Sequence, residues 1–256
     1  VVEPLVATPP RSRRRATFAA RRTGGGVVIG FNEAGSHRIV DLEASAVLSP
    51  ELVGLLPRLR ELLAGVLDRD AAADVAATRL PDGLDVTLYL SDEPGLDRRE
   101  ALAAFAEEAD LARLSVATGD PRSARPEPVA VRRPPVVTSR GIPVAVPAAT
   151  FLQPSDEGEA ALAGLVAGAL AEAGVMEGLV ADLFCGLGTL TLPWLAGGEG
   201  RRLLAVDHDG PAVAALEAAV RAAGLGPRVA TRSRDLHRDP VAAGELAACR
   251  AVVFDP

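Results

Sequence analysis

Residues 179–192 read Leu-Val-Ala-Asp-Leu-Phe-Cys-Gly-Leu-Gly-Thr-Leu-Thr-Leu. The nearly continuous apolar run up to Phe184 is typical of a strand that a parallel sheet buries on both faces. Gly186 and Gly188 follow at once, where such a strand turns into a helix and where the backbone can approach a ligand closely. The stretch therefore predicts an α/β fold with a ligand site at the carboxyl end of this strand.

Strand and helix signals alternate on either side of this stretch. A helix rich in Ala and Leu is expected from residue 156 to about residue 173, and another helix follows the glycine turn. Beyond it we expect a strand over 203–207, a helix over 211–223, a short strand near 228–231 and a final strand over 251–254. Such alternation predicts a doubly wound, mostly parallel sheet with helices on both faces.

Three acidic residues lie at or just after the ends of these expected strands, namely Asp182, Asp207 and Asp235. Asp207 comes a little under 20 residues after Gly188, the separation expected for a carboxylate that accepts hydrogen bonds from ribose hydroxyls. Asp235 would accept one from an adenine amino group. A nicotinamide-binding motif would have a third glycine where Thr191 stands, so the pattern resembles the methyl-donor site of class I methyltransferases and favours adenosylmethionine over NAD. An ordinary glycine turn that binds nothing is the alternative.

The first half of the chain predicts a different architecture. We expect strands over 16–20, 26–31, 37–42, 76–80 and 84–90, a leucine-rich helix from about 49 to 67, and a helix over 97–111. The Pro- and Arg-rich stretch 120–147 indicates connectors and edge strands. We therefore place a domain boundary inside this stretch or just after it, and divide the chain into residues 1–147 and 148–256.

Composition limits the class of protein. The 256 residues carry 27 basic and 34 acidic side chains, a net charge of −7, and every basic residue is arginine. An apolar content of 48% supports a hydrophobic core and excludes disorder along the whole length. No run reaches the ~20 apolar residues of a membrane helix, so we expect a cytoplasmic location and no membrane partner.

Two cysteines, Cys185 and Cys249, cannot by themselves form a disulfide framework or a four-cysteine metal site. The three histidines, His37, His208 and His237, are scattered without ligand spacing. The sequence therefore predicts no metal site.

Basic residues concentrate near the beginning of the chain. Six arginines lie within twelve positions: Arg11, Arg13, Arg14, Arg15, Arg21 and Arg22. This local density suits contact with a phosphate backbone even on an acidic protein. A solvated charged strand explains the same cluster equally well.

Three motifs in the second half carry a more specific resemblance. They are Phe151-Leu152-Gln153-Pro154-Ser155, the glycine turn from Asp182 to Pro193, and Val253-Phe254-Asp255-Pro256. In this order they resemble the motifs of the uracil-C5 RNA methyltransferases, which modify 23S rRNA and tRNA. The segments 13–18 and 35–41 are similar to the central domain of that family, so the resemblance covers nearly the whole chain. It implies a Rossmann-like class I methyltransferase domain, incomplete at its C terminus, preceded by a smaller α+β central domain.

The resemblance also implies the site residues. Adenosylmethionine would be bound by Gln153, Phe184, Gly186, Gly188, Thr189, Asp207 and Asp235. Asp255 would begin the family's Asp-Pro-Pro-Arg motif beside the target base, and the six early arginines would contact RNA, rRNA more readily than tRNA. Ser155, Thr189 and Asp207 stand where many members have Asn, Asn and Glu, and each keeps a hydrogen-bonding group.

In this family a cysteine thiolate adds to C6 of uracil, and a general base, assigned to a glutamate, removes the proton at C5. Both residues follow the Asp-Pro motif, so the resemblance places them outside this sequence, which reads as the middle of a longer protein and is expected to be inactive alone. An iron–sulfur cluster, where the family has one, lies upstream. Cys185 is then a packing residue, and a monomer is expected.

Two other functions stay open from the sequence alone. The chain could be an RNA-binding module that keeps a methyltransferase scaffold without catalysis. It could also be a methyltransferase for another base or for protein.

Overall fold

The structure is a computed structural model that describes residues 5–121 and 123–256. The chain forms two compact units, one of Thr8–Pro135 and one of Val136–Pro256 that also includes residues 5–7. The sequence places the boundary at 147/148, but the hairpin of β8 (Val136–Ser139) and β9 (Ile142–Ala145) belongs to the second unit. The division falls before this hairpin because β9 lies against helix α5 (Gly210–Ala222).

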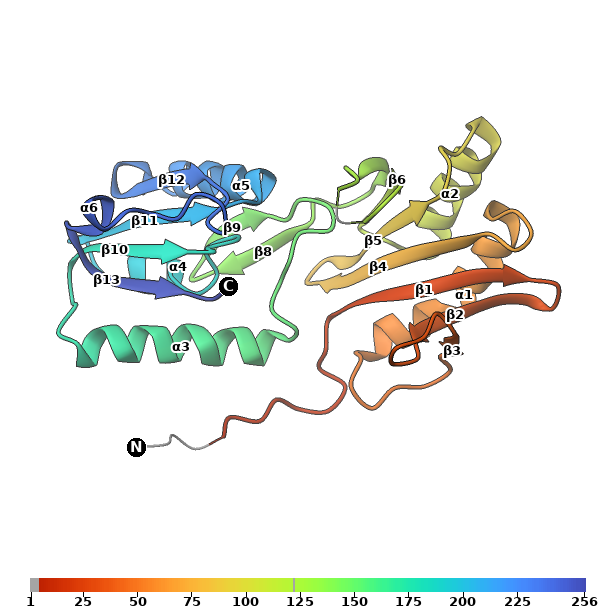
Figure 1. The fold of residues 1–256 in the computed structure, drawn as a ribbon, viewed down its shortest axis with the longest axis horizontal. Coiled ribbons are helices and arrows are strands. Elements are labelled where there is room, and N and C mark those ends of the chain that lie inside the picture. Colours follow the sequence, from red (N-terminus) through yellow and green to blue (C-terminus); the bar gives the residue numbers. More distant parts are fainter. Residues whose placement is uncertain (1–4, 122) are drawn as a thin grey trace. The chain divides into compact units, whose positions relative to one another are not determined.

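A seven-stranded sheet forms the centre of the first unit (Figure 1). Its strand order is β3-β2-β1-β4-β5-β6-β7, and every neighbouring pair is antiparallel except β5 and β6. The strands are β1 (Arg15–Thr23), β2 (Gly26–Asn32), β3 (Ile39–Asp41), β4 (Ala72–Leu80), β5 (Gly83–Leu90), β6 (Arg113–Thr118) and β7 (Glu127–Val131). The strands expected over 16–20 and 26–31 are present as β1 and β2, which pair as an antiparallel hairpin.

Helices α1 (Pro50–Val66) and α2 (Leu96–Glu108) cover one face of this sheet. Pro50 suits the first turn of α1, where no backbone N–H is needed for the helix. Leucines at helical spacing, among them Leu52, Leu56 and Leu59, are fully buried against strand residues such as Phe18. The unit therefore has a hydrophobic core of its own, built from the period-3.6 and period-2 patterns of the sequence.

Strand β6 is absent from the sequence-based expectation, although it lies in the interior of the sheet between β5 and β7. The segment is six residues long and follows α2 after only four residues. Its side chains Leu114 and Val116 enter the core, and the intervening Ser115 is equally buried. A short strand with a polar residue on a buried face gives neither a clear alternation nor a continuous apolar run.

Four parallel strands form the main sheet of the second unit, in the order β12-β11-β10-β13. They are β10 (Gly178–Leu183), β11 (Arg201–Asp207), β12 (Val229–Ser233) and β13 (Cys249–Phe254). Besides α5, the helices are α3 (Asp156–Glu172), α4 (Leu192–Leu195), α6 (Ala243–Leu246) and a 3-10 turn at Gly226–Arg228. The expected α/β class is confirmed. Within the described residues, no helix is both long and apolar enough to cross a membrane.

The strand order fixes where a ligand can bind. β10 pairs with β11 on one side and with β13 on the other. After β10 the chain first adds β11 on one side and later crosses over to add β13 on the other, so the order in which strands are added reverses at β10. In open parallel sheets, ligands bind outside the carboxyl ends of the strands at this switch point. The glycine turn that follows β10 lies at that point (Figure 1).

Candidate functional site

A cavity of about 480 Å³ lies at the carboxyl ends of β10, β11 and β13. All of its lining residues belong to the second unit: Thr150, Phe151, Leu152, Gln153, Pro154, Phe184, Cys185, Gly186, Leu187, Thr189, Leu190, Asp207, His208, Asp209, Asp255 and Pro256. Apolar surface predominates, with a few carboxylates and one amide. This composition is typical of sites for small organic ligands.

Asp207, the last residue of β11, is buried and holds the glycine turn in place. Its Oδ2 accepts a hydrogen bond from the backbone N–H of Gly186 at 2.8 Å. Its Oδ1 accepts another from the backbone N–H of Asp209 at 2.8 Å, and the imidazole of His208 lies 3.2 Å from the same oxygen. Each carboxylate oxygen has two lone pairs, so Asp207 can still accept hydrogen bonds from a ligand.

Two aromatic rings lie together beside the glycine turn. Phe184 has a left-handed backbone conformation (φ +64°), which is uncommon for a residue with a side chain and marks the sharp end of β10. Its ring centroid lies 5.2 Å from that of His237, in the loop after β12. A flat ring at the cavity wall suits contact with an aromatic ligand such as adenine.

Gln153 and Asp255 connect the two segments that flank the sheet. The side-chain amide of Gln153 donates a hydrogen bond to Oδ2 of Asp255 at 3.3 Å. They come from the segment before α3 and from the residue after β13, which are 102 positions apart in the chain. The motif residues predicted for cofactor and target base therefore meet at one end of the cavity.

A second carboxyl group, Asp182, lies in β10 behind the glycine turn. The hydroxyl of Thr191 donates a short hydrogen bond to it. Burial raises the pKa of Asp182 to about 7, and the neighbouring carboxylates of Asp207 and Asp255 contribute to the rise. Near neutral pH this group can therefore be protonated.

Cys185 is buried beside the same carboxylates. Burial, followed by the charges of Asp182 and Asp207, raises the pKa of its thiol. A thiol with a raised pKa carries little of the reactive thiolate. This agrees with the expectation that Cys185 is a packing residue.

The structure brings five of the seven predicted cofactor residues to the cavity: Gln153, Phe184, Gly186, Thr189 and Asp207. Gly188 does not line it. Its φ is +73°, and a Cβ there would lie 3.0 Å from a methyl group of Leu216 and 3.2 Å from Leu192, so its role is the close packing of the turn against α5.

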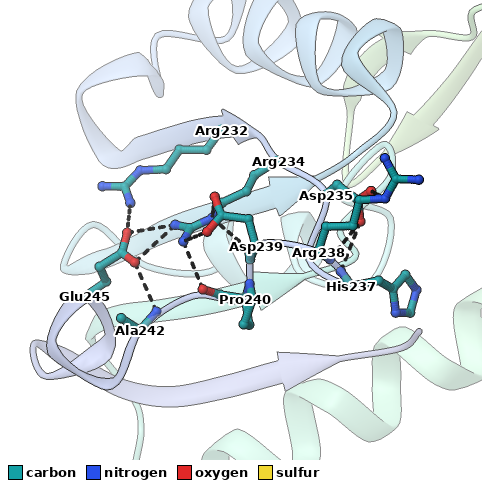
Figure 2. A network of polar contacts seen from close by, with 9 residues as sticks. All are labelled: Arg232, Arg234, Asp235, His237, Arg238, Asp239, Pro240, Ala242 and Glu245. Carbon is teal, nitrogen blue, oxygen red and sulfur yellow. Dashed lines mark hydrogen bonds and ion pairs between the residues drawn. The ribbon is translucent and has the colours of Figure 1, made fainter.

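Asp235 also stands apart from the cavity lining. Figure 2 shows its carboxylate turned toward the backbone of its own loop, where Oδ1 accepts hydrogen bonds from the N–H groups of His237 and Arg238. The adjacent Arg234 lies between Asp239 and Glu245, with contacts of 2.8 to 3.1 Å. This network fixes the loop that carries His237, which meets the ring of Phe184.

The six early arginines do not form one surface. Arg14 is only 3% exposed, and Arg22 donates to the backbone carbonyl of Leu67 at the end of α1. Arg15 is half-buried, and this burial, with Arg13 and Arg14 nearby, lowers its pKa. Arg11, Arg13 and Arg21 are exposed. Alternation along β1 separates side chains that are neighbours in sequence, which a count of charges does not capture.

Phe151, from the first of the three motifs, and His208, next to Asp207, also line the cavity, and so does Asp209, which the sequence analysis did not single out. Asp209 caps α5 by accepting from the N–H of Ala212 at 3.1 Å, and the Asp-x-x-Ala spacing before a helix is a signal that was available. No group of three or more metal-ligating side chains occurs among the described residues.

No protein-family model matches the chain. Known sequences do match it. It is 39% identical over 256 residues to a protein of Brucella suis named as an RNA methyltransferase, covering 100% of this chain and 58% of the relative. A Mesorhizobium japonicum protein, also named as an RNA methyltransferase, is 35% identical over 255 residues, and the match covers 100% of this chain and 58% of that protein. The 23S rRNA (uracil(1939)-C(5))-methyltransferase RlmD of Tolumonas auensis is 29% identical over 167 residues, with 65% and 36% covered.

One solved structure resembles the fold over nearly the whole chain. The tRNA (uracil-54, C5)-methyltransferase of Pyrococcus abyssi, in complex with S-adenosyl-L-homocysteine, matches with a TM-score of 0.65. It is 14% identical, and the match covers 97% of this chain and 56% of that one. At this identity the likeness is one of fold.

A parallel sheet with a glycine turn after β10 and a carboxylate ending β11 defines a class I methyltransferase-type domain. The chain is a homologue of the RNA methyltransferases, among them a uracil-C5 enzyme, as its motifs predict. It spans about 58% of the length of the relatives with which it shares most identity.

Proposed function

We propose that this chain is part of an adenosylmethionine-dependent methyltransferase that modifies C5 of a uridine in cytoplasmic RNA, with 23S rRNA as the expected substrate. The observation that carries the proposal is the cavity at the switch point, where Asp207, the glycine turn and the Gln153–Asp255 pair meet. The relatives named as RNA methyltransferases support the class of reaction.

The residues present fit adenosylmethionine. The cavity volume lies within the ~300–1,000 Å³ usual for ligand sites. Asp207 offers acceptor positions for ribose hydroxyls, and Phe184 offers a ring face for adenine. Backbone groups of the turn around Gly186 are close to the cavity because that residue has no side chain. When bound, adenosylmethionine supplies an electrophilic methyl group.

The chain's own residues then orient the reactants. Asp207 fixes the turn and the ribose edge of the site through its two backbone contacts. Gln153 holds Asp255 at the cavity end where the resemblance places the target base. Preorganised groups of this kind accelerate a reaction by positioning rather than by bond making.

We place the nucleophilic cysteine and the general base outside this chain. Two facts support this for the nucleophile: Cys185 is buried with a raised thiol pKa, and Cys249, at the start of β13, also has a pKa raised by burial. Neither thiol has the lowered pKa of a reactive cysteine.

For RNA contact we propose the exposed arginines of the first unit. Arg11, Arg13 and Arg21 have the exposure that phosphate binding needs, whereas Arg14 and Arg22 serve the fold. Binding through these side chains should weaken steeply with added salt.

Cofactor binding is tested by calorimetry with S-adenosyl-L-homocysteine. Asp207→Ala removes the ribose acceptor and should cost about 1 to 3 kcal/mol of binding free energy, because donors are left unpaired. Asp207→Asn keeps one acceptor for the Gly186 N–H and controls for collapse of the turn. Glu172→Ala, on the exposed side of α3, should change nothing. An unchanged affinity in Asp207→Ala would show that the cavity is not the cofactor site.

The substrate is tested by nucleoside analysis of RNA from a strain that lacks the gene. We expect one 5-methyluridine to disappear from 23S rRNA and to return when the full-length gene is restored. If every 5-methyluridine persists and another methylated base or protein is lost, the enzyme acts on a different substrate. If no methylation changes, the RNA-binding module without catalysis is the better description.

A further inference from the structure

A second cavity, of about 340 Å³, lies in the first unit and has no role in the function proposed above. It is lined by Ala19, Arg21, Asn32, His37, Asp74 and Tyr89, among other residues. All lining residues belong to Thr8–Pro135, so the cavity is complete within this unit.

The strand register places this cavity on the face of the sheet opposite α1 and α2. Ala19 in β1 pairs with Asp74 in β4, and Asp74 pairs with Tyr89 in β5, so these three side chains point the same way. Their neighbours Phe18 and Val75 point into the core beneath the helices. Arg21, two residues beyond Ala19, shares the open face.

Asp74 is the unusual group in this cavity. Its side chain is half-buried, and within the described part of the chain no donor or cation pairs with its carboxylate. Burial, together with the charge of Asp120, raises its pKa. A partly desolvated carboxylate without a donor is costly in a sheet, and such a cost is expected where a ligand supplies the missing hydrogen bonds.

The other polar groups define the chemistry of that ligand. Tyr89 is 7% exposed and borders the cavity, and burial, followed by the charges of Asp74 and Asp85, raises the pKa of its phenol. His37 adds a second flat ring at the rim, and Asn32 adds an amide. Arg21 is exposed and, among the residues described, has no carboxylate partner. An acceptor in the cavity, the exposed imidazole ring of His37 and an exposed cation match a base, its stacking surface and its phosphate.

We propose that this cavity binds one unpaired nucleotide of the RNA, whose base carries an amino group. The base N–H groups donate to Asp74, and the phosphate lies against Arg21. The volume is at the lower end of the range usual for ligand sites, enough for a single nucleotide. Uracil has no amino group and offers a carboxylate only its single N3–H, so the amino-bearing nucleotide preferred here differs from the one that is methylated. The inference rests on the proposal that the substrate is RNA.

Fluorescence anisotropy with labelled RNA decamers tests the site. The probes are a decamer of uridines and three decamers with a single central G, C or A. We expect the amino-bearing decamers to bind the protein about fivefold or more tighter than the uridine decamer. Asp74→Ala should abolish this preference and leave the affinity for the uridine decamer unchanged. Arg21→Ala should weaken all four probes by a similar factor.

The matched controls lie on the helix face of the same unit. Asp97→Ala, in the first turn of α2, and Arg58→Ala, on the exposed side of α1, should keep both the affinity and the preference. Equal binding of all four decamers, no binding of any, or a preference that survives Asp74→Ala would each overturn the proposal. Binding of S-adenosyl-L-homocysteine is measured on every variant. If the unmodified protein does not bind S-adenosyl-L-homocysteine, the proposed function is refuted. If Asp74→Ala still binds it, the defect of that variant is confined to this cavity.

Discussion

Asp182 is a buried carboxyl group whose protonation is linked to folding. Its pKa, about 7, lies above the ordinary value of 3.8, with burial as the main cause. Below about pH 4 the folded and unfolded chains both hold the proton, and the group does not oppose folding. As the pH rises from about 4 to about 7, the unfolded chain loses this proton while the folded chain keeps it, so the free energy of unfolding decreases.

Asp182→Asn should remove this pH dependence. The asparagine oxygen can still accept from Thr191, but it does not titrate. From about pH 5 to about pH 8, the unfolding free energy of the second unit should fall by on the order of 2 to 3 kcal/mol more in the unmodified protein than in the variant. Urea titrations at both pH values measure this, with Glu172→Gln on the exposed side of α3 as control. Parallel curves for the protein and Asp182→Asn would contradict the assignment.

Single residues also show what sequence could and could not specify at the site. The sequence predicts three cavity residues correctly. An apolar strand indicates Phe184, the glycine turn after it indicates Gly186, and the spacing from the turn indicates Asp207; all three line the cavity. Asp235 follows the strand after which the spacing predicts a cofactor-binding acid. Its loop bends, however, so that its carboxylate accepts hydrogen bonds from the backbone of the same loop. The direction of a side chain in a loop depends on tertiary packing, which a spacing rule does not contain.

At the scale of elements, the parallel contact of β5 and β6 contains a buried ion pair. Asp85 and Arg113 are register partners, and their side chains form two hydrogen bonds of 2.7 and 2.9 Å. Their side chains are only 5% and 11% exposed. Arg38 and Glu33 form a similar two-bond pair at 3.0 Å, but with 71% and 47% exposure.

The two pairs should differ strongly in their effect on stability. Asp85→Ala leaves a buried guanidinium uncompensated and should cost about 3 to 5 kcal/mol. Glu33→Ala releases a solvated arginine and should cost less than about 1 kcal/mol. Denaturant unfolding of the first unit measures both. Equal costs would mean that the 85–113 pair is hydrated in solution.

The same strands show where sequence patterns succeed at this scale. α1 was predictable because its leucines repeat at helical spacing over 17 residues and a proline marks its start. β6 was not, because its partner β5 is remote in sequence and its buried Ser115 breaks the apolar pattern. The hairpin β8–β9 was expected as edge strands, but its place in the second unit depends on contact with α5.

At the scale of the whole molecule, each compact unit has its own core. The large core cluster around α1 and α2 contains only residues of the first unit, and the cluster around Ala181, Leu204 and Val206 contains only residues of the second. Units with separate cores can open independently, and a ligand stabilises only the unit whose native state binds it. The proposed cofactor site lies wholly within the second unit.

Hydrogen exchange with and without S-adenosyl-L-homocysteine tests this division. At about 100 times its dissociation constant, the ligand should stabilise the second unit by about 2.7 kcal/mol. Amides of β10 and β11 that exchange through unfolding of that unit should then slow by about 100-fold, since each 1.4 kcal/mol is tenfold. Amides of β1, β4 and β5 should keep their rates, because their protection comes from a core that does not contact the ligand. Asp207→Ala should reduce the slowing at any fixed ligand concentration. If amide exchange slowed equally in both units, the two units would unfold as one cooperative body. Cofactor binding in the second unit would then also stabilise β1 and the arginines that it carries.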